Sequence, residues 1–219
     1  MNRYKKFRVP TLDAVTAACA VYRQLGNVVK KAELNDTSPT SKTLIMDHLS
    51  GTAPVEILPV DQAQALEVTE YIRQRMMVDT LAGRGNSPFF LGVATLLEKE
   101  TTSSSDLGIL AWAPKLMDDL IARDDRNQDI RSALHDSRYL GTVDSAISLE
   151  FHTLECYYVK AHDHFVALGH DGAGNAVSFW SRHQVTGVRE IRGRVRRHDR
   201  NAKFGNIAVT YINYVKFKK

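Results

Sequence analysis

The chain has 219 residues, enough for one large domain or two small ones, and its 43% hydrophobic content excludes a disordered protein. No apolar run approaches the roughly 20 residues that a membrane helix needs. The formal net charge of +4 is unevenly distributed: residues 137–219 hold 13 Lys and Arg against 7 Asp and Glu, whereas residues 1–136 hold 16 against 18. This asymmetry points to an anionic partner. Because no amphipathic basic helix accompanies the charge, it favours nucleic acid over a membrane.

Nothing in the sequence indicates secretion. The basic N-terminus, MNRYKKFR, leads into no signal-peptide core, and Cys19 and Cys156 lie far apart in differently patterned segments. Unpaired cysteines suit a reducing compartment. The sequence therefore predicts a cytoplasmic protein, located in the host cell if the chain is viral.

Residues 11–25 carry the first helical pattern. Thr11 is expected to cap this helix and Gly26 to end it. Residues 1–10 read as an irregular arm, and residues 30–40 as a polar loop or a short helix. The apolar runs within residues 42–59 fit either strands or one helical turn, and the pattern leaves this open. One stripe of the first helix holds Val15, Ala18, Cys19 and Tyr22.

Residues 61–81 form the clearest helical pattern, with Asp61 as the expected cap and Gly83 just after its end. Its apolar positions are expected to include Leu66, Tyr71, Met76 and Met77.

Three further segments complete the helical part. Ser87 and Pro88 open a helix that runs to about residue 100, and TTSSS at 101–105 reads as a polar loop. Because of Pro114, the next helix is expected to restart at Ala113, and residues 126–135 add another helical piece. The first 136 residues are thus predicted to be mostly helical.

The pattern then changes to the period of two that is typical of strands. We expect five strands, separated by turns that include a glycine-rich one at 169–175. The predicted fold is α+β: a helical domain of unknown role (residues 1–136), then a small five-stranded OB-like β-barrel (residues 137–219), with an SH3-like barrel as the alternative. The expected strands are residues 147–160, 164–168, 175–181, 189–197 and 207–217.

Arginines dominate the fourth expected strand. Because successive side chains of a strand point to opposite faces, Arg192, Arg194 and Arg196 should share one face, and Ile191, Gly193 and Val195 the other. The second face can enter a core. The first is a row of guanidinium groups suited to a phosphate backbone, although a charged strand face is often merely solvated.

Several aromatic side chains in the barrel could stack on bases. In each of the pairs Phe179-Trp180 and Tyr157-Tyr158, one ring should point to the core and the other outward. We expect Phe179 in the core and Trp180 exposed, and we expect Phe151 and Phe165 in the core. The candidate platforms are Tyr157, Tyr158, Phe165, Phe179, Trp180, Tyr211 and Tyr214.

The end of the chain matches two short sequence patterns. Gly193, Val195, Arg196 and His198 match a strand of the form G-x-V-K/R-x-H, and a T-x-L-N-x-V-K pattern follows with Ile212 in place of leucine. Other matching runs are SRYLG at 137–141 and DGAGNAVSFW at 171–180. The last 80 or so residues thereby resemble OB-fold modules of bacteriophage replication and recombination proteins. The second pattern is matched by Thr210, Asn213, Val215 and Lys216.

No residue pattern indicates catalysis or a cofactor. The pair His162 and His164 could share a strand face and chelate a metal, but no third ligand stands at a diagnostic spacing. The pairs Asp118-Asp119 and Asp124-Asp125 read as a solvated acidic helix face. Phosphate-binding loops and nucleophile elbows are not found in the sequence. A metal-dependent nuclease using the histidine pair is the least favoured interpretation.

The resemblance implies a protein that binds single-stranded nucleic acid, DNA first, with little sequence preference. Together with the lack of catalytic motifs, it predicts a non-enzymatic phage protein that is an accessory in DNA replication or recombination. The helical domain would contact a replication or recombination protein, or another copy of the chain. The alternative is an assembly subunit whose basic barrel docks on an acidic protein. The residues predicted to bind nucleic acid are Arg192, Arg194, Arg196, Arg197, Arg200, Lys203, Tyr158, Trp180, Tyr214 and Lys216.

Overall fold

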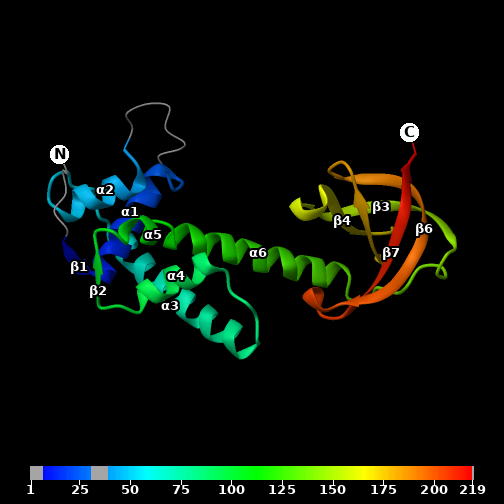
Figure 1. Cartoon of the computed structure of the whole chain (residues 1–219), viewed down its shortest axis with the longest axis horizontal. Coiled ribbons are helices and arrows are strands. Elements are labelled where there is room, and N and C mark those ends of the chain that lie inside the picture. The colour runs from blue at the N-terminus through cyan, green and yellow to red at the C-terminus, as the bar shows by residue number, and fades with distance from the viewer. Residues whose placement is uncertain (1–6, 31–38, 219) are drawn as a thin grey trace. The chain divides into compact units, whose positions relative to one another are not determined.

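A computed structural model describes residues 7–30 and 39–218. Two compact units make up the chain, Met1–Ala122 and Arg123–Lys219 (Figure 1). The first is helical and the second contains a closed five-stranded β-barrel, so the predicted α+β class is confirmed. The arm expected at residues 1–6 and most of the loop expected at 30–40 lie outside the described residues.

Helices build the first unit around a core of small and aliphatic side chains, with Ala14, Val15, Ile45, Val68 and Ile72 fully buried. A two-stranded antiparallel sheet accompanies them, in which Val9 pairs with Thr102. None of the described helices combines the length and apolar character that crossing a membrane requires. The elements are β1 (Arg8–Pro10), α1 (Thr11–Leu25), α2 (Ser41–Leu49), α3 (Pro59–Leu81), α4 (Pro88–Leu97), β2 (Thr101–Ser103), α5 (Leu107–Leu110) and α6 (Ala113–Ala133).

Several helix ends agree with the sequence-based predictions, and others do not. Gly26 ends α1 in a left-handed conformation with φ of 67°, and the Ser87 hydroxyl accepts the N–H of Phe90 to cap α4, both as predicted. Thr11 does not cap α1: it is the buried first residue of the helix, and Pro10 occupies the cap position. The continuous helix α6 includes residues 126–133 of the piece expected separately at 126–135.

In this unit the structure also decides one question that the sequence left open and corrects two predictions. The undecided segment 42–59 contains α2. The first three residues of the TTSSS run, expected as a loop, form β2 because they pair with β1, and the last two lie in a turn. On α3, Leu66 and Met77 are 59% and 58% exposed, so they do not define its buried face. The buried side chains of α3 are Asp61, Ala65, Val68, Ile72 and Asp79.

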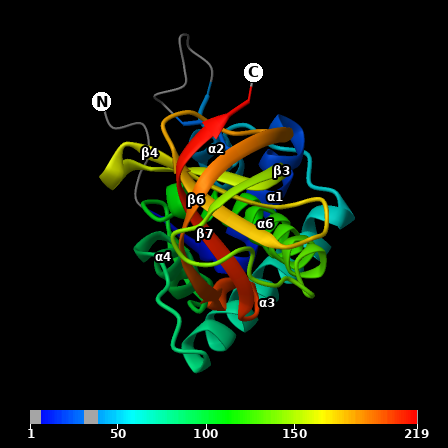
Figure 2. The same cartoon turned by 90° about the vertical axis from the view of Figure 1, so that its right-hand side faces the viewer.

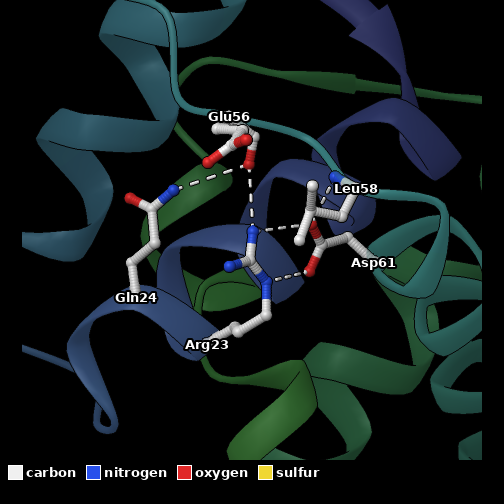
Figure 3. A network of polar contacts seen from close by, with 5 residues as sticks. All are labelled: Arg23, Gln24, Glu56, Leu58 and Asp61. Atoms are coloured by element: carbon white, nitrogen blue, oxygen red, sulfur yellow. Dashed lines mark hydrogen bonds and ion pairs between the residues drawn. The ribbon is translucent and has the colours of Figure 1, made fainter.

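Asp61 has a different role from the predicted cap. The helix begins at Pro59, and the Asp61 carboxylate, two residues later, accepts the N–H of Leu58 at 2.7 Å. The side chain is fully buried and forms a two-pronged ion pair with Arg23 of α1, with N–O distances of 2.8 and 3.0 Å (Figure 3). These contacts lower the pKa of Asp61, and the Arg23 hydrogen bond is the largest cause. The ion pair thus joins α1 to the start of α3.

The second unit is a barrel with strand order β3-β4-β5-β7-β6, closed by pairing of β6 with β3. All neighbouring strands are antiparallel except β5 and β7, which are parallel over three residues. Figure 2 shows β6 and β7 of this unit side by side. The connectivity is consistent with an OB-like fold. The strands are β3 (Ala146–Val159), β4 (His164–His170), β5 (Ala176–Ser181), β6 (Val188–Asn201) and β7 (Ile207–Phe217).

Two apolar clusters stabilise the barrel. The interior contains Phe151, Phe179, Ile191 and Val195, all at most 2% exposed, whereas the expected core residue Phe165 is only partly buried. A second cluster includes the end of α6, where Ile130 packs with Leu134 and barrel residues. The last part of α6 therefore belongs structurally to the barrel unit.

Motif residues before the first barrel strand and on β7 hold neighbouring segments of the barrel together. The Ser137 hydroxyl donates to the Ala208 carbonyl and accepts the Ala176 N–H, both at 2.7 Å, which bridges the parallel strands β5 and β7. The Thr210 hydroxyl, fully buried, accepts the N–H of Leu140. These motif positions have a structural role.

Gly169 on β4 lies so close to β3 that only hydrogen fits there. A Cβ atom at this position would lie 2.1 Å from the His152 carbonyl oxygen and 2.6 Å from the Phe151 ring. We expect Gly169→Ala to lower the free energy of unfolding of the barrel by about 1–3 kcal/mol, because strands that pair must move apart. Gly172→Ala is the control, since nothing lies within 4 Å of its Cβ position. Urea unfolding followed by Trp180 fluorescence in a Trp112→Phe background measures both, and equal stabilities would contradict the expectation.

Candidate nucleic-acid interface

The arginine-bearing strand alternates as predicted over its first part. Ile191, Gly193 and Val195 are buried, whereas Arg192, Arg194 and Arg196 are exposed. The small space beside Gly193 explains why glycine stands at this position, because a Cβ atom would lie 3.1 Å from the Asn213 carbonyl oxygen. β6 continues beyond the predicted end at residue 197 to Asn201, so Arg200 also lies on the strand.

A β-bulge changes the alternation at Arg196. Val195 pairs with Ile212 of β7, and Arg197 pairs with the next residue, Tyr211, so that Arg196 is the extra residue. Both Arg196 and Arg197 are therefore exposed. The guanidinium carbon of Arg197 lies 4.4 Å from the centre of the Tyr211 ring, a cation–π contact.

These two arginines reach a groove with a volume of about 920 Å³ on β3, β4, β5 and β7. Arg182, in the segment after β5, is a third cation in its lining, and no carboxylate lines it among the described residues. The parallel pairing of β5 with β7 ends at Ser178 and Tyr211, both groove residues. The aromatic side chains in the lining are Tyr157, Phe179, Trp180, Tyr211, Tyr214 and Phe217.

Two of the exposed rings stand in one cross-strand row. Tyr157 of β3 pairs with Val166 of β4, which pairs in turn with Trp180 of β5. The Tyr157 and Trp180 side chains are 47% and 46% exposed, and Phe179 is buried at 2%, as predicted for the Phe179-Trp180 pair. Both tyrosines of the other pair are exposed, so the expectation that one would be buried was wrong. Partial burial of the Tyr157 hydroxyl raises its pKa.

Tyr158 is not part of the groove lining. It pairs with Phe165, with ring centres 5.2 Å apart, and its hydroxyl donates to Asp163 at 2.5 Å. This hydrogen bond raises the Tyr158 pKa. Pairing of β3 with β6 ends at His152, six residues before Tyr158. The prediction that an exposed Tyr158 belongs with Trp180 therefore finds no support in their placement.

The backbone of Tyr214 is strained. Arg194 pairs with Asn213 and Arg192 with Lys216, so Tyr214 and Val215 both stand opposite Gly193. In this bulge Tyr214 has φ of 54°, a conformation that favours glycine, and its side chain is 77% exposed at the groove. An unfavourable backbone that displays a ring at a groove is typical of functional positions.

Two substitutions of Tyr214 are expected to differ in stability but not in affinity for single strands. Tyr214→Gly should be about 1 kcal/mol more stable than Tyr214→Ala, because glycine relieves the left-handed strain. Both variants should lose a similar part of any affinity for single strands, about 1–3 kcal/mol, since both lack the ring. Urea unfolding and fluorescence anisotropy measure the two quantities. A Tyr214→Gly variant less stable than Tyr214→Ala would contradict the strain argument.

The remaining predicted binding residues lie outside the groove. Arg200 donates to the Asn206 carbonyl at 2.9 Å, and Lys203, in a turn before β7, lies 3.3 Å from Glu155. Arg192, Arg194 and Lys216 lie farther along β6 and β7, where Arg192 pairs with Lys216. The structure thus brings together Arg196, Arg197, Trp180 and Tyr214 from the predicted set.

Two histidines line the groove, and a third contacts one of its rings. His162 lies in a turn and not on the strand with His164, and its ring meets Trp180 edge-on at 5.2 Å. His164 and His183 line the groove. Within residues 7–30 and 39–218, no three His, Cys, Asp or Glu side chains gather as a metal ion would require.

Sequence reasoning underestimated Tyr157 and did not name Arg182 or Asn213 as site residues. The alternation of β3 could have placed Tyr157 with Trp180 only if the strand register had been known. Comparisons of the chain with protein-family models, with curated proteins and with solved structures give no match. The functional argument therefore rests on the groove itself.

Proposed function

We propose that this chain is a non-catalytic protein that binds single-stranded nucleic acid, with DNA as the first ligand to test, in the groove of its barrel. The observation that carries the proposal is the combination of exposed rings with guanidinium groups in one groove that no described carboxylate lines. Bases stack on aromatic rings whatever their identity, and phosphates need cations nearby, so such a groove binds single strands with little sequence preference.

The placement of the rings favours single strands over duplex. Trp180 and Tyr157 each offer about half of the side chain to solvent, and Tyr214 offers more. Bases in a duplex are already stacked and paired, and their faces are not available to such rings. The phage-type role in replication or recombination, implied by the sequence resemblance, belongs to this proposal, as does a protein partner for the helical unit.

The test is fluorescence anisotropy with a labelled single strand of about 30 nucleotides, roughly two footprints of an OB-fold, beside a duplex of equal length and over a salt series. We expect tighter binding of the single strand, quenching of Trp180 emission in a Trp112→Phe background, and a log–log salt slope of about −0.7 per phosphate contacted.

Weak binding that is equal for single strand and duplex would overturn the proposal. The arginines and rings would then be better explained as a surface that docks on an acidic protein, which is the alternative function. Binding of an RNA strand more tightly than DNA would keep the groove and change the ligand.

A further inference from the structure

The outer face of β6 carries cations that the groove does not use. Arg192 and Arg194 are exposed, and Lys216 of β7 stands directly across from Arg192. On the other side, β3 places only small side chains beside them, Ser148 opposite Arg192 and Ala146 opposite Arg194. In the described part of the chain, the two guanidinium groups and the Lys216 ammonium have no hydrogen-bond or ion-pair partner. They form an open row, the "β6 cation row" (Arg192, Arg194 and Lys216).

The β6 cation row is continuous with the groove. Arg194 pairs with Asn213, which itself lines the groove, and Arg196, also in the lining, follows two residues later on the same face of β6. Two residues of strand span about 6.6 Å, so the cations follow one another at close and regular steps.

Acidic side chains mark the other end of the row. Glu190 precedes Arg192 on the same face of β6, and it pairs across the sheet with Glu150 of β3. Glu190 forms an ion pair with Lys218 at 2.7 Å, and Glu150 lies 2.8 Å from His152. A phosphate backbone that follows the arginines is favoured as far as Arg192 and repelled beyond it.

From these observations we propose that a single strand held in the groove continues along β6, with its phosphates on Arg194, Arg192 and Lys216. This inference rests on the proposed function and adds a second segment to the site. The two segments differ in chemistry: the groove offers rings and cations, whereas the β6 cation row offers cations only and no ring of its own. Bases stack in the first segment, and only the backbone is held in the second.

The test is a length series of single strands from about 4 to about 16 nucleotides, the range of footprints known for OB-folds. The variant Arg192→Ala/Arg194→Ala/Lys216→Ala is compared with a control that removes the same charge elsewhere in the unit, Arg123→Ala/Arg126→Ala/Arg138→Ala. All six side chains are exposed.

For the wild type and the control, affinity should rise with length beyond what the groove can hold. The row variant should bind the shortest strand as the control does, gain little from added length, and lose about 2 units of log–log salt slope on the longest strand, from three phosphate contacts at about 0.7 each.

Three outcomes overturn the path along β6: an undiminished gain with length in the row variant, an equal loss for the shortest and longest strands, or a loss no larger than that of the control. If no strand of any length binds the wild type, the proposed function itself fails. The two failures are therefore distinguishable.

Discussion

Replacing Trp180 and Tyr157 together by alanine is expected to weaken binding of single strands at least about 30-fold. Each ring that stacks on a base contributes about 1–3 kcal/mol, so the double variant loses at least about 2 kcal/mol if the two effects add. The two side chains stand on either side of Val166, in one row across three strands. They are about half exposed, so their loss leaves the barrel core intact.

Tyr158→Ala is the matched control for this prediction. Tyr158 neighbours Tyr157 in sequence and is equally exposed, at 50%, but it pairs with Phe165 outside the groove lining. Its removal should change affinity less than about twofold. Anisotropy titrations at one salt concentration measure all variants, and thermal unfolding verifies that they fold. A similar loss for Tyr158→Ala and the double variant would show that the rings do not act through the groove.

The contrast between these two tyrosines shows what the sequence could predict. Local alternation is a property of one strand, and it placed Ile191 and Val195 inside and the neighbouring arginines outside correctly. Whether a side chain such as that of Tyr158 is buried depends also on the strands that pack against it. β6 stops pairing with β3 at His152, six residues before Tyr158, and nothing in the residues around Tyr158 reports this.

Bulges set a second limit on prediction. The extra residues at Arg196 and at Tyr214 arise from the register between β6 and β7, so they cannot be read from either strand alone. They bring Arg197 to the same side as Arg196 and display Tyr214. The sequence therefore predicted the residue types of the site, and the register decided which of them meet.

The same limit applies to short elements. β1 and β2 have three residues each and are separated by about 90 positions, and the TTSSS run has no apolar alternation. Its first three residues become a strand only by pairing with Arg8–Pro10 of β1. On α3, by contrast, Leu66 and Met77 are apolar and still 59% and 58% exposed, so apolar character alone did not place them in the core.

In the helical unit, Arg23→Gln should lower the free energy of unfolding by about 3 kcal/mol at neutral pH. The Asp61 side chain is fully buried, and removal of its guanidinium partner leaves the buried charge without an ion-pair partner, with only the Leu58 N–H still donating to it. The value lies at the low end for buried pairs because Arg23 is one-third exposed. The control is Arg73→Gln, whose ion pair with Glu98 at 2.9 Å is about half exposed on both sides, so it should cost less than about 1 kcal/mol.

The stabilisation by Arg23 should also depend on pH. The ion pair lowers the pKa of Asp61 below its value of about 3.9 in the unfolded chain, so its contribution is complete above about pH 5 and is lost as pH falls through the folded-state pKa. The difference between wild type and Arg23→Gln should therefore shrink between pH 5 and pH 2, whereas that for Arg73→Gln stays small throughout. Urea unfolding followed by Trp112 fluorescence in a Trp180→Phe background measures this.

A second substitution separates the buried charge from the rest of the contact. Adding Asp61→Asn to Arg23→Gln removes the charge and keeps an oxygen that can accept the Leu58 N–H, now made at 2.7 Å. The double variant should regain part of the lost stability, because an amide costs less to bury than an unpaired carboxylate. If it is instead less stable than Arg23→Gln alone at pH 7, the uncompensated charge is not the cause. The loss of the hydrogen bond from Arg23 to the Glu56 carbonyl, at 3.1 Å, would then be the better explanation for the effect of Arg23→Gln.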